Sequence, residues 1–131
     1  MIGLDTNILV RYLTQDDPGQ SPRATELIER RLTEDNPGFI SVVAMTETVW
    51  VLERAYRLSN VRIAEVIERL LQTSVLVVEN EAEVFAAMTV LQEGSGSFAD
   101  ALIGELGDGA GCSVTLTFDQ KAARLRNFGL A

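Results

Sequence analysis

Four acidic residues from distant parts of the chain each interrupt an apolar segment: Asp5, Glu47, Asp100 and Asp119. An unpaired charge is expensive to bury in such a segment and normally implies a partner. No comparable set of cations occurs at the same places in the sequence, and carboxylate oxygens are the ligands that hard divalent cations prefer. The four residues therefore predict a site for Mg²⁺ or Mn²⁺, ions that activate water and stabilise charge on phosphate groups.

The composition excludes most other catalytic systems. The chain of 131 residues has no histidine, which rules out Ser-His-Asp and Cys-His nucleophilic systems, histidine-ligated zinc and imidazole-dependent ribonucleases. The only cysteine, Cys112, can form neither an internal disulfide nor a cysteine-based zinc site. Because it lies beside an apolar run, we expect Cys112 to be in the core.

Each acid also has a purely structural explanation. Aspartate is favoured at helix N-caps and in first helical turns, which accounts for Asp5, Asp100 and Asp119 taken singly. Glu47 is the only charged residue in its apolar run, and its structural alternative is a polar helix face shared with Arg54. The four acids are therefore more informative together than singly.

The overall charge restricts how the chain can bind nucleic acid. The net charge is −8 and the isoelectric point about 4.5, the wrong sign for a protein that holds nucleic acid by a basic surface alone. Any RNA contact must therefore be local. The cationic residues form three groups, which are either basic stripes or, more commonly, solvated helix faces: Arg23, Arg30 and Arg31; Arg54, Arg57, Arg62 and Arg69; and Lys121, Arg124 and Arg126.

Short apolar runs alternate with helical patterns, which predicts one α/β domain of residues 1–131 with a parallel sheet between helices. The predicted strands are Ile2–Leu4, Phe39–Ile40, Val75–Val78, Val114–Phe118 and an edge strand at Phe128–Leu130. The predicted helices are Ile8–Leu13, a helix from the N-cap Ser21 and Pro22 to near Asn36, Val43–Arg57, a helix from Ser59 past Leu71, Asn80–Gln92, Ala99–Leu106 and a short basic helix from Asp119. Val75–Val78 is continuously aliphatic, as expected of a central strand covered on both faces.

The order of these elements predicts where the acids meet. In an open parallel sheet, ligands bind beyond the carboxyl ends of the strands. Asp5 and Asp119 each follow a predicted strand directly and should share one edge. Glu47 lies about a turn into the helix after the second strand, and Asp100 lies in the first turn of a later helix. We therefore expect all four acids at the same edge of the sheet.

Four segments resemble, in their order and spacing, the motifs of PIN-domain nucleases: Leu4-Asp5-Thr6-Asn7, Thr46-Glu47 in a helix, Phe98-Ala99-Asp100-Ala101-Leu102-Ile103, and Thr117-Phe118-Asp119-Gln120-Lys121-Ala122. The match covers essentially the whole chain and is most similar to the stand-alone VapC-type toxins of toxin–antitoxin pairs. The resemblance implies a PIN-like three-layer sandwich, with a central parallel sheet flanked by helices. One departure is a glycine-rich stretch that puts the length of the helix after Asp100 in doubt: Gly104, Gly107, Gly109 and Gly111.

The resemblance also implies a Mg²⁺-dependent endoribonuclease, usually a homodimer, that a small cognate antitoxin holds inactive. The roles implied by position are Asp5 and Asp100 as the main metal ligands, Glu47 and Asp119 as the acids that complete the site, and Asn7 and Thr117 as polar groups that orient the carboxylates. Because the chain is acidic, we expect the antitoxin to be basic where it enters the site, with an arginine in place of the metal charge. Amphipathic helices carrying Trp50 and Tyr56 expose apolar surface that a homodimer would bury.

Two other functions remain open. A catalytically silent PIN-like interaction module would typically lack one or more of the acids, whereas all four are present. A phospho-acceptor receiver domain needs a lysine after its last strands and a paired acid near the first; Lys121 is the sole lysine, and Asp5 has no acidic neighbour. No apolar stretch reaches the ~18–20 residues that span a bilayer, and Met1 leads into Ile2–Leu4 without a signal sequence, so we expect a cytoplasmic protein without membrane contact.

Overall fold

The computed structural model describes residues 1–131 as alternating strands and helices. The strands are β1 (Ile2–Gly3), β2 (Gly38–Ile40), β3 (Leu76–Val78), β4 (Thr115–Thr117) and β5 (Phe128–Leu130). The helices are α1 (Thr6–Thr14), α2 (Gln20–Glu26), α3 (Val42–Arg54), α4 (Asn60–Gln72), α5 (Glu81–Glu93) and α6 (Phe98–Gly109), with a π-helical turn at Leu27–Arg31 and a 3-10 turn at Ala122–Arg124. Every strand pair is parallel, which confirms the predicted α/β class with a parallel sheet.

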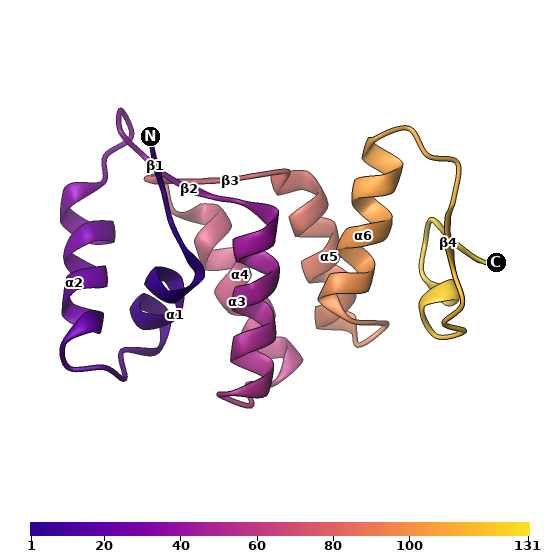
Figure 1. Ribbon diagram of the computed structural model, residues 1–131, viewed down its shortest axis with the longest axis horizontal. Coiled ribbons are helices and arrows are strands. Elements are labelled where there is room, and N and C mark those ends of the chain that lie inside the picture. Colours follow the sequence, from indigo (N-terminus) through magenta and orange to yellow (C-terminus); the bar gives the residue numbers. More distant parts are fainter.

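The parallel strands form two separate sheets. One sheet has the order β1-β2-β3, and β4 pairs with β5 alone. Ile2 aligns with Gly38 in the first sheet, and Thr115 aligns with Phe128 in the second. Figure 1 shows β4 at the opposite end of the molecule from β1, beyond α5 and α6. The two predicted strands that precede Asp5 and Asp119 are therefore not neighbours within one chain.

Side-chain caps fix where several helices begin. Ser41, Ser59 and Ser97 each accept a hydrogen bond from the backbone N–H three residues later, at 3.1, 3.3 and 3.1 Å. Asp5 caps α1 by accepting from the N–H of Thr6 at 2.7 Å. Each cap satisfies a donor that has no partner inside its helix. The starts of α1, α3, α4 and α6 are thus determined by a few adjacent residues.

Two local predictions were wrong. The second predicted helix does not begin after Ser21, because the Asp17 carboxylate accepts from the N–H groups of Gly19 and Gln20 and starts α2 earlier. Ser21 is instead buried inside α2, where its hydroxyl donates to the carbonyl of Arg11 at 2.8 Å. Cys112 is exposed rather than in the core, because it lies in the turn that leaves α6.

The core lies between the helices and one face of the first sheet. Its fully buried residues include Ile40, Met45 and Ile63. On the other face Gly3 is exposed and Val77 is 41% exposed. The prediction that Val75–Val78 is covered on both faces was therefore wrong, because β3 is an edge strand and not a central one.

The glycine-rich stretch does not end α6, which continues to Gly109 instead of the predicted Leu106. A Cβ atom at Gly104 would lie 2.5 Å from the Phe128 ring, and one at Gly107 would lie 2.7 Å from the Thr115 hydroxyl. Glycine at these positions lets α6 approach β4 and β5 closely. The C-terminal sheet is thereby packed on α6 as one unit.

Candidate functional site

The segments that carry two of the predicted acids, Asp5 and Glu47, are joined at the carboxyl end of β1. Asp5 lies between β1 and α1, and the next residue, Thr6, donates its hydroxyl to Oε1 of Glu47 at 2.8 Å. Helix α1 packs against α3, so this bond links the two segments that carry the acids. Both carboxylates are exposed. Thr6, which the sequence prediction did not single out, is thus the residue that joins this half-site.

The second pair lies around the start of α6 and the end of β4. Asp100 is the third residue of α6, and its N–H is bonded to the Ser97 cap. It lines a cavity of about 270 Å³ together with Lys121. Asp119 forms the adjoining turn, where its Oδ1 accepts from the N–H of Lys121 at 2.8 Å. The Thr117 hydroxyl accepts from the backbone N–H of Asp119 at 3.0 Å and does not contact its carboxylate; a role for Thr117 in orienting the carboxylates stays a prediction.

The two half-sites do not combine within one chain. No group of three or more acidic side chains lies close enough to hold a metal ion, whereas Mg²⁺ requires a nearly octahedral set of oxygen ligands. The four predicted residues therefore do not fit a complete metal site in a single chain, because β4 does not lie beside β1. The assignment of Asp5, Glu47, Asp100 and Asp119 as catalytic residues stays a prediction.

A basic cavity of about 340 Å³ lies between α1 and α2, next to the first half-site. Its cationic lining consists of Arg11, Arg23 and Arg31, and its wall reaches Asn7, two residues after Asp5. No ion pair involves Arg23 or Arg31, whereas Arg11 pairs with Asp16 at 3.4 Å. The cavity thus combines two unpaired cations with a wall residue, Asn7, that lies in the same turn of the chain as Asp5.

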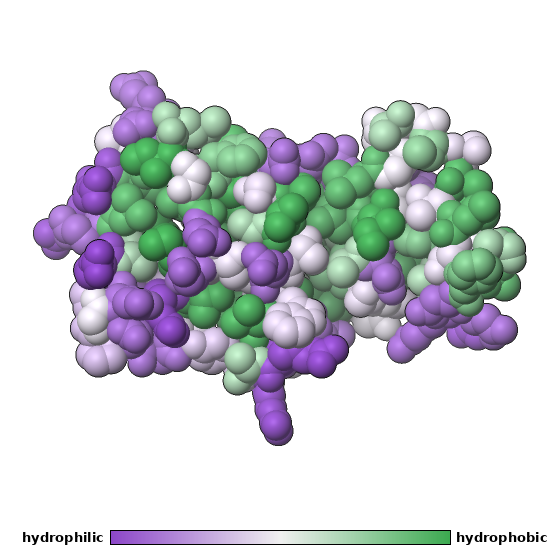
Figure 2. Space-filling model, in the orientation of Figure 1, coloured by the Kyte–Doolittle hydropathy of each residue, from purple (hydrophilic) through white to green (hydrophobic).

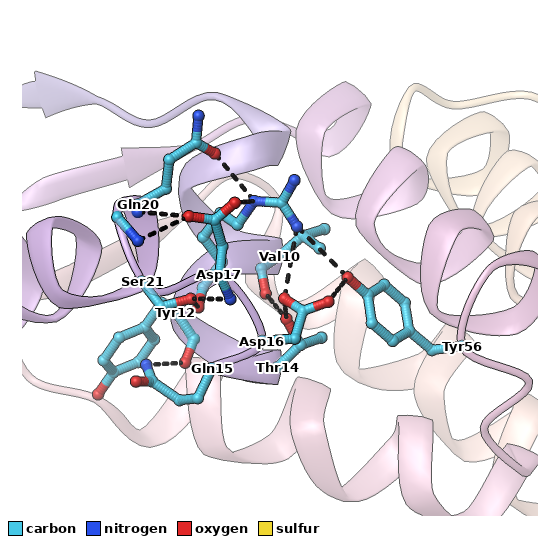
Figure 3. Close-up of polar contacts among 11 residues, drawn as sticks. Val10, Tyr12, Thr14, Gln15, Asp16, Asp17, Gln20, Ser21 and Tyr56 are labelled. Carbon is cyan, nitrogen blue, oxygen red and sulfur yellow. Dashed lines mark hydrogen bonds and ion pairs between the residues drawn. The ribbon is translucent and has the colours of Figure 1, made fainter.

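A polar network fixes Arg11 on the α1 side of this cavity (Figure 3). The guanidinium donates to Gln20 at 2.9 Å and to Asp16 at 3.4 Å. Asp16 also accepts from the Tyr56 hydroxyl at 2.6 Å and from the Thr14 hydroxyl at 2.7 Å. The bonds from Tyr56 and then Thr14 lower the pKa of the Asp16 carboxyl below its ordinary value.

The Asp16 network predicts a pH-dependent contribution to stability. A carboxyl with a lowered pKa in the folded state stabilises the fold above its unfolded pKa, and that contribution is lost as the pH falls through the folded value. We expect Tyr56→Phe to lower the free energy of unfolding at pH 7, and the difference from wild type to narrow below about pH 4. Urea unfolding across this range measures the effect. In the Asp16→Asn background, Tyr56→Phe should no longer alter the pH dependence of the free energy of unfolding. If Tyr56→Phe altered this pH dependence as much as it does in the wild type, the role of Asp16 would be contradicted.

An apolar groove of about 440 Å³ runs between α3 and α6. Seven of its nine lining residues are hydrophobic, among them Val43, Trp50 and Ile103, and Glu47 lies at its edge. These three side chains are 67%, 56% and 54% exposed. Figure 2 shows hydrophobic residues gathered over the middle of this face and at the end that carries β4. Part of the apolar surface expected from the sequence thus lies beside Glu47, and another part lies at the end that carries β4.

One comparison with known proteins found a family that matches nearly the whole chain. The family described as PIN domain matches residues 2–127. No curated protein matches the chain. None of the helices is both long and apolar enough to span a membrane.

Proposed function

Because the chain belongs to the PIN domain family, whose members are generally metal-dependent nucleases, we propose that it is a Mg²⁺-dependent endoribonuclease. Two observations support the proposal: the family match spans residues 2–127, and all four acids lie in segments that resemble the motifs of PIN-domain nucleases. Mn²⁺ is expected to replace Mg²⁺, because both accept oxygen ligands. Cleavage of structured RNA with Mg²⁺, and its absence with EDTA, tests the proposal directly.

A divalent cation, when bound, supplies activation of water and neutralisation of charge on the phosphate. The chain's part would be to provide carboxylate ligands, and the Thr6 hydroxyl, next to Asp5, holds the Glu47 carboxylate at the end of β1. Activity therefore requires Asp100 and Asp119 to reach this half-site. The alternative function, which the separation of the acids favours, is a catalytically silent interaction module. Absence of RNA cleavage with every divalent cation would support this alternative.

The basic cavity between α1 and α2 supports RNA as the substrate. The net charge of −8 repels a polyanion over most of the surface, so productive contact must be local. Arg23 and Arg31 form no ion pair with the protein and line a cavity that ends at Asn7. We infer that the cavity holds phosphates of the RNA strand next to the scissile bond.

Removing either free cation should weaken RNA binding without disturbing the chemical step. We expect Arg23→Gln and Arg31→Gln each to raise the KM for RNA several-fold, with little change in kcat, and to reduce the slope of log affinity against log salt by about 1. Arg30→Gln is the matched control, because Arg30 lies next to Arg31 but pairs with Glu26 at 3.5 Å and does not line the cavity. Equal effects of all three substitutions would indicate general electrostatics and contradict a phosphate site.

We further propose that the nuclease is the toxin of a toxin–antitoxin pair and acts in the cytoplasm as a homodimer. The motif order and chain length support this, together with the exposed Trp50 and Val43 beside Glu47. An antitoxin segment would combine apolar side chains for this groove with an arginine for the exposed carboxylates. Arrest of growth on induced expression, relieved by a basic partner expressed with it, is the expected result.

A further inference from the structure

Strand β1 has an edge without a partner. The N–H groups of Ile2 and Leu4 donate to the carbonyls of Pro37 and Phe39 on the β2 side, at 2.8 and 2.9 Å. Because backbone groups alternate in direction along a strand, the N–H and C=O of Gly3 point away from β2. No strand pairs with this side of β1.

Strand β4 has a complementary free edge. The N–H of Thr115 donates to Asn127 at 2.7 Å, and the carbonyl of Thr117 accepts from Ala131 at 2.9 Å, both on the β5 side. The N–H and C=O of Leu116 therefore point away from β5. A two-stranded parallel sheet is an unusual isolated unit, because parallel sheets are normally covered on both faces. Here Leu116 is 62% and Phe118 is 90% exposed.

We propose that β4 of one copy of this chain pairs in parallel with β1 of a second copy, and that this exchange completes the acidic site. The combined sheet has the order β5-β4-β1-β2-β3, with the first two strands from one chain and the last three from the other. Asp100 and Asp119 of one copy then join Asp5 and Glu47 of the other. The inference rests on the proposed nuclease function for its catalytic meaning, but not for the strand pairing.

The hydrogen-bond directions limit this pairing to two registers. In a parallel pair, a residue whose N–H and C=O face the partner strand aligns with a residue whose own N–H and C=O face away from it. Gly3 can therefore align only with Thr115 or Thr117, because the backbone groups of these two residues face β5. Alignment of Gly3 with Thr117 places Asp5 opposite Asp119, two residues later on each strand. Of the two permitted registers, the alignment with Thr117 is the one that brings together the two acids that follow the strands, and it is the one that we propose.

The side-chain directions agree with the same register. Thr115 faces α6, since its hydroxyl lies at the position of a Gly107 Cβ, and Thr117 shares that face because side chains alternate along a strand. Gly3 of one copy would then lie beneath α6 of the other copy. There is room for α6 there, because Gly3 has no side chain and a Cβ atom at this position would have no neighbour within 4 Å in the single chain. Leu116 points to the opposite face, next to Ile2 and the core helices. One pairing thus covers the exposed face of the first sheet and the exposed residues of the second.

A second copy supplies hydrogen-bond partners for the free edges of β1 and β4 without rearranging either chain. Within one chain, α3, α5 and α6 lie between β1 and β4 (Figure 1). Moving β4 onto its own β1 would require α6 to leave α5 and α3, contacts that bury Phe98 and Leu102 to 1% and 3% exposure. Reciprocal pairing of two copies closes the assembly with two-fold symmetry and leaves no free β1 edge.

Complementation between two inactive variants tests whether each site is shared. Asp5→Asn and Asp100→Asn should each be inactive alone, and co-refolding equal amounts should restore about a quarter of the wild-type activity, because half of the sites in mixed dimers receive both mutations and half receive neither. If every site belongs to one chain, each site in the mixture carries one mutation and stays inactive. No recovery, with an active wild type that passes the same refolding, would overturn the proposal.

Cross-linking tests the strand exchange independently of activity. In a Cys112→Ser background, chains with Gly3→Cys are mixed with size-tagged chains that carry Thr117→Cys. Paired residues on neighbouring strands lie about 4.8 Å apart, within the range that a disulfide spans. We expect a covalent heterodimer on a non-reducing gel, and none when Ser74→Cys replaces Thr117→Cys. Absence of the heterodimer overturns the exchange, whereas a heterodimer without nuclease activity supports the exchange and refutes only the proposed function.

Discussion

Asp5→Asn and Asp100→Asn are each expected to reduce Mg²⁺-dependent RNA cleavage by more than about 100-fold. Loss of a residue that merely supports a metal ligand already costs 10- to 100-fold, and these changes remove a charged ligand itself. Both substitutions should spare the fold. Asparagine is as good an N-cap as aspartate at the start of α1, and the Ser97 cap of α6 does not involve the Asp100 side chain. Initial rates on a structured RNA, with circular dichroism of each variant, measure both parts.

The controls separate a catalytic role from a general loss of negative charge. Asp35→Asn changes an exposed aspartate in the loop before β2 and should leave the rate unchanged. Asp119→Asn should have a smaller effect than the other two, because its turn can retain the bonds to Lys121 and Ala122. Cleavage at the wild-type rate by both Asp5→Asn and Asp100→Asn would refute the metal-site assignment.

The helix starts were predictable where the signal is local. Ser59 was expected at the beginning of a helix, and it caps α4 in the structure. Such a cap depends on a side chain and a backbone N–H three residues later, so the adjacent sequence is sufficient. Ser21 was also expected to cap a helix but does not, because the Asp17 carboxylate accepts from two N–H groups at the start of α2 instead. A local rule fails where two capping residues compete.

The separation of the two sheets could not be predicted from the strands themselves. β1 and β4 contain two and three residues, and such short strands carry little information about their partner or register. Each contains a single aliphatic residue, Ile2 or Leu116, and is followed closely by an aspartate. Nothing in these patterns distinguishes pairing within one chain from pairing between two copies. The prediction that Asp5 and Asp119 share an edge therefore depended on a non-local contact.

The candidate site could be predicted only in part, because it also depends on contacts between segments that are far apart in the sequence. Asp5 and Glu47 were expected to meet, and the Thr6 hydroxyl joins their segments. The argument that the acids are buried was wrong for Asp5, Glu47 and Asp119, which are exposed. An apolar run identifies a helix but does not say which residue faces the core: Thr48, next to Glu47 in α3, is 1% exposed.

Metal binding should stabilise the protein strongly, and only when the second half-site is present. A ligand at 100 times its dissociation constant stabilises the folded state by about 2.7 kcal/mol, which corresponds to roughly 10 °C in Tm for a chain of this size. We expect millimolar Mn²⁺ to raise the Tm of the wild type by this order relative to EDTA, at a fixed protein concentration. Asp100→Asn should lose most of the shift.

Leu116→Arg distinguishes a site shared between chains from a site inside one chain. Leu116 is 62% exposed in the single chain, so arginine there should leave each chain folded. In the exchanged dimer the same side chain lies against Ile2 and the core helices, where an unpaired charge is costly. The variant should therefore be monomeric in light scattering and show no Mn²⁺ shift in Tm, although it keeps all four acids. Phe85→Arg, at a 54% exposed position on α5 away from both strands, should keep the dimer and the shift. A monomeric Leu116→Arg with a full Mn²⁺ shift would show that one chain binds the metal alone.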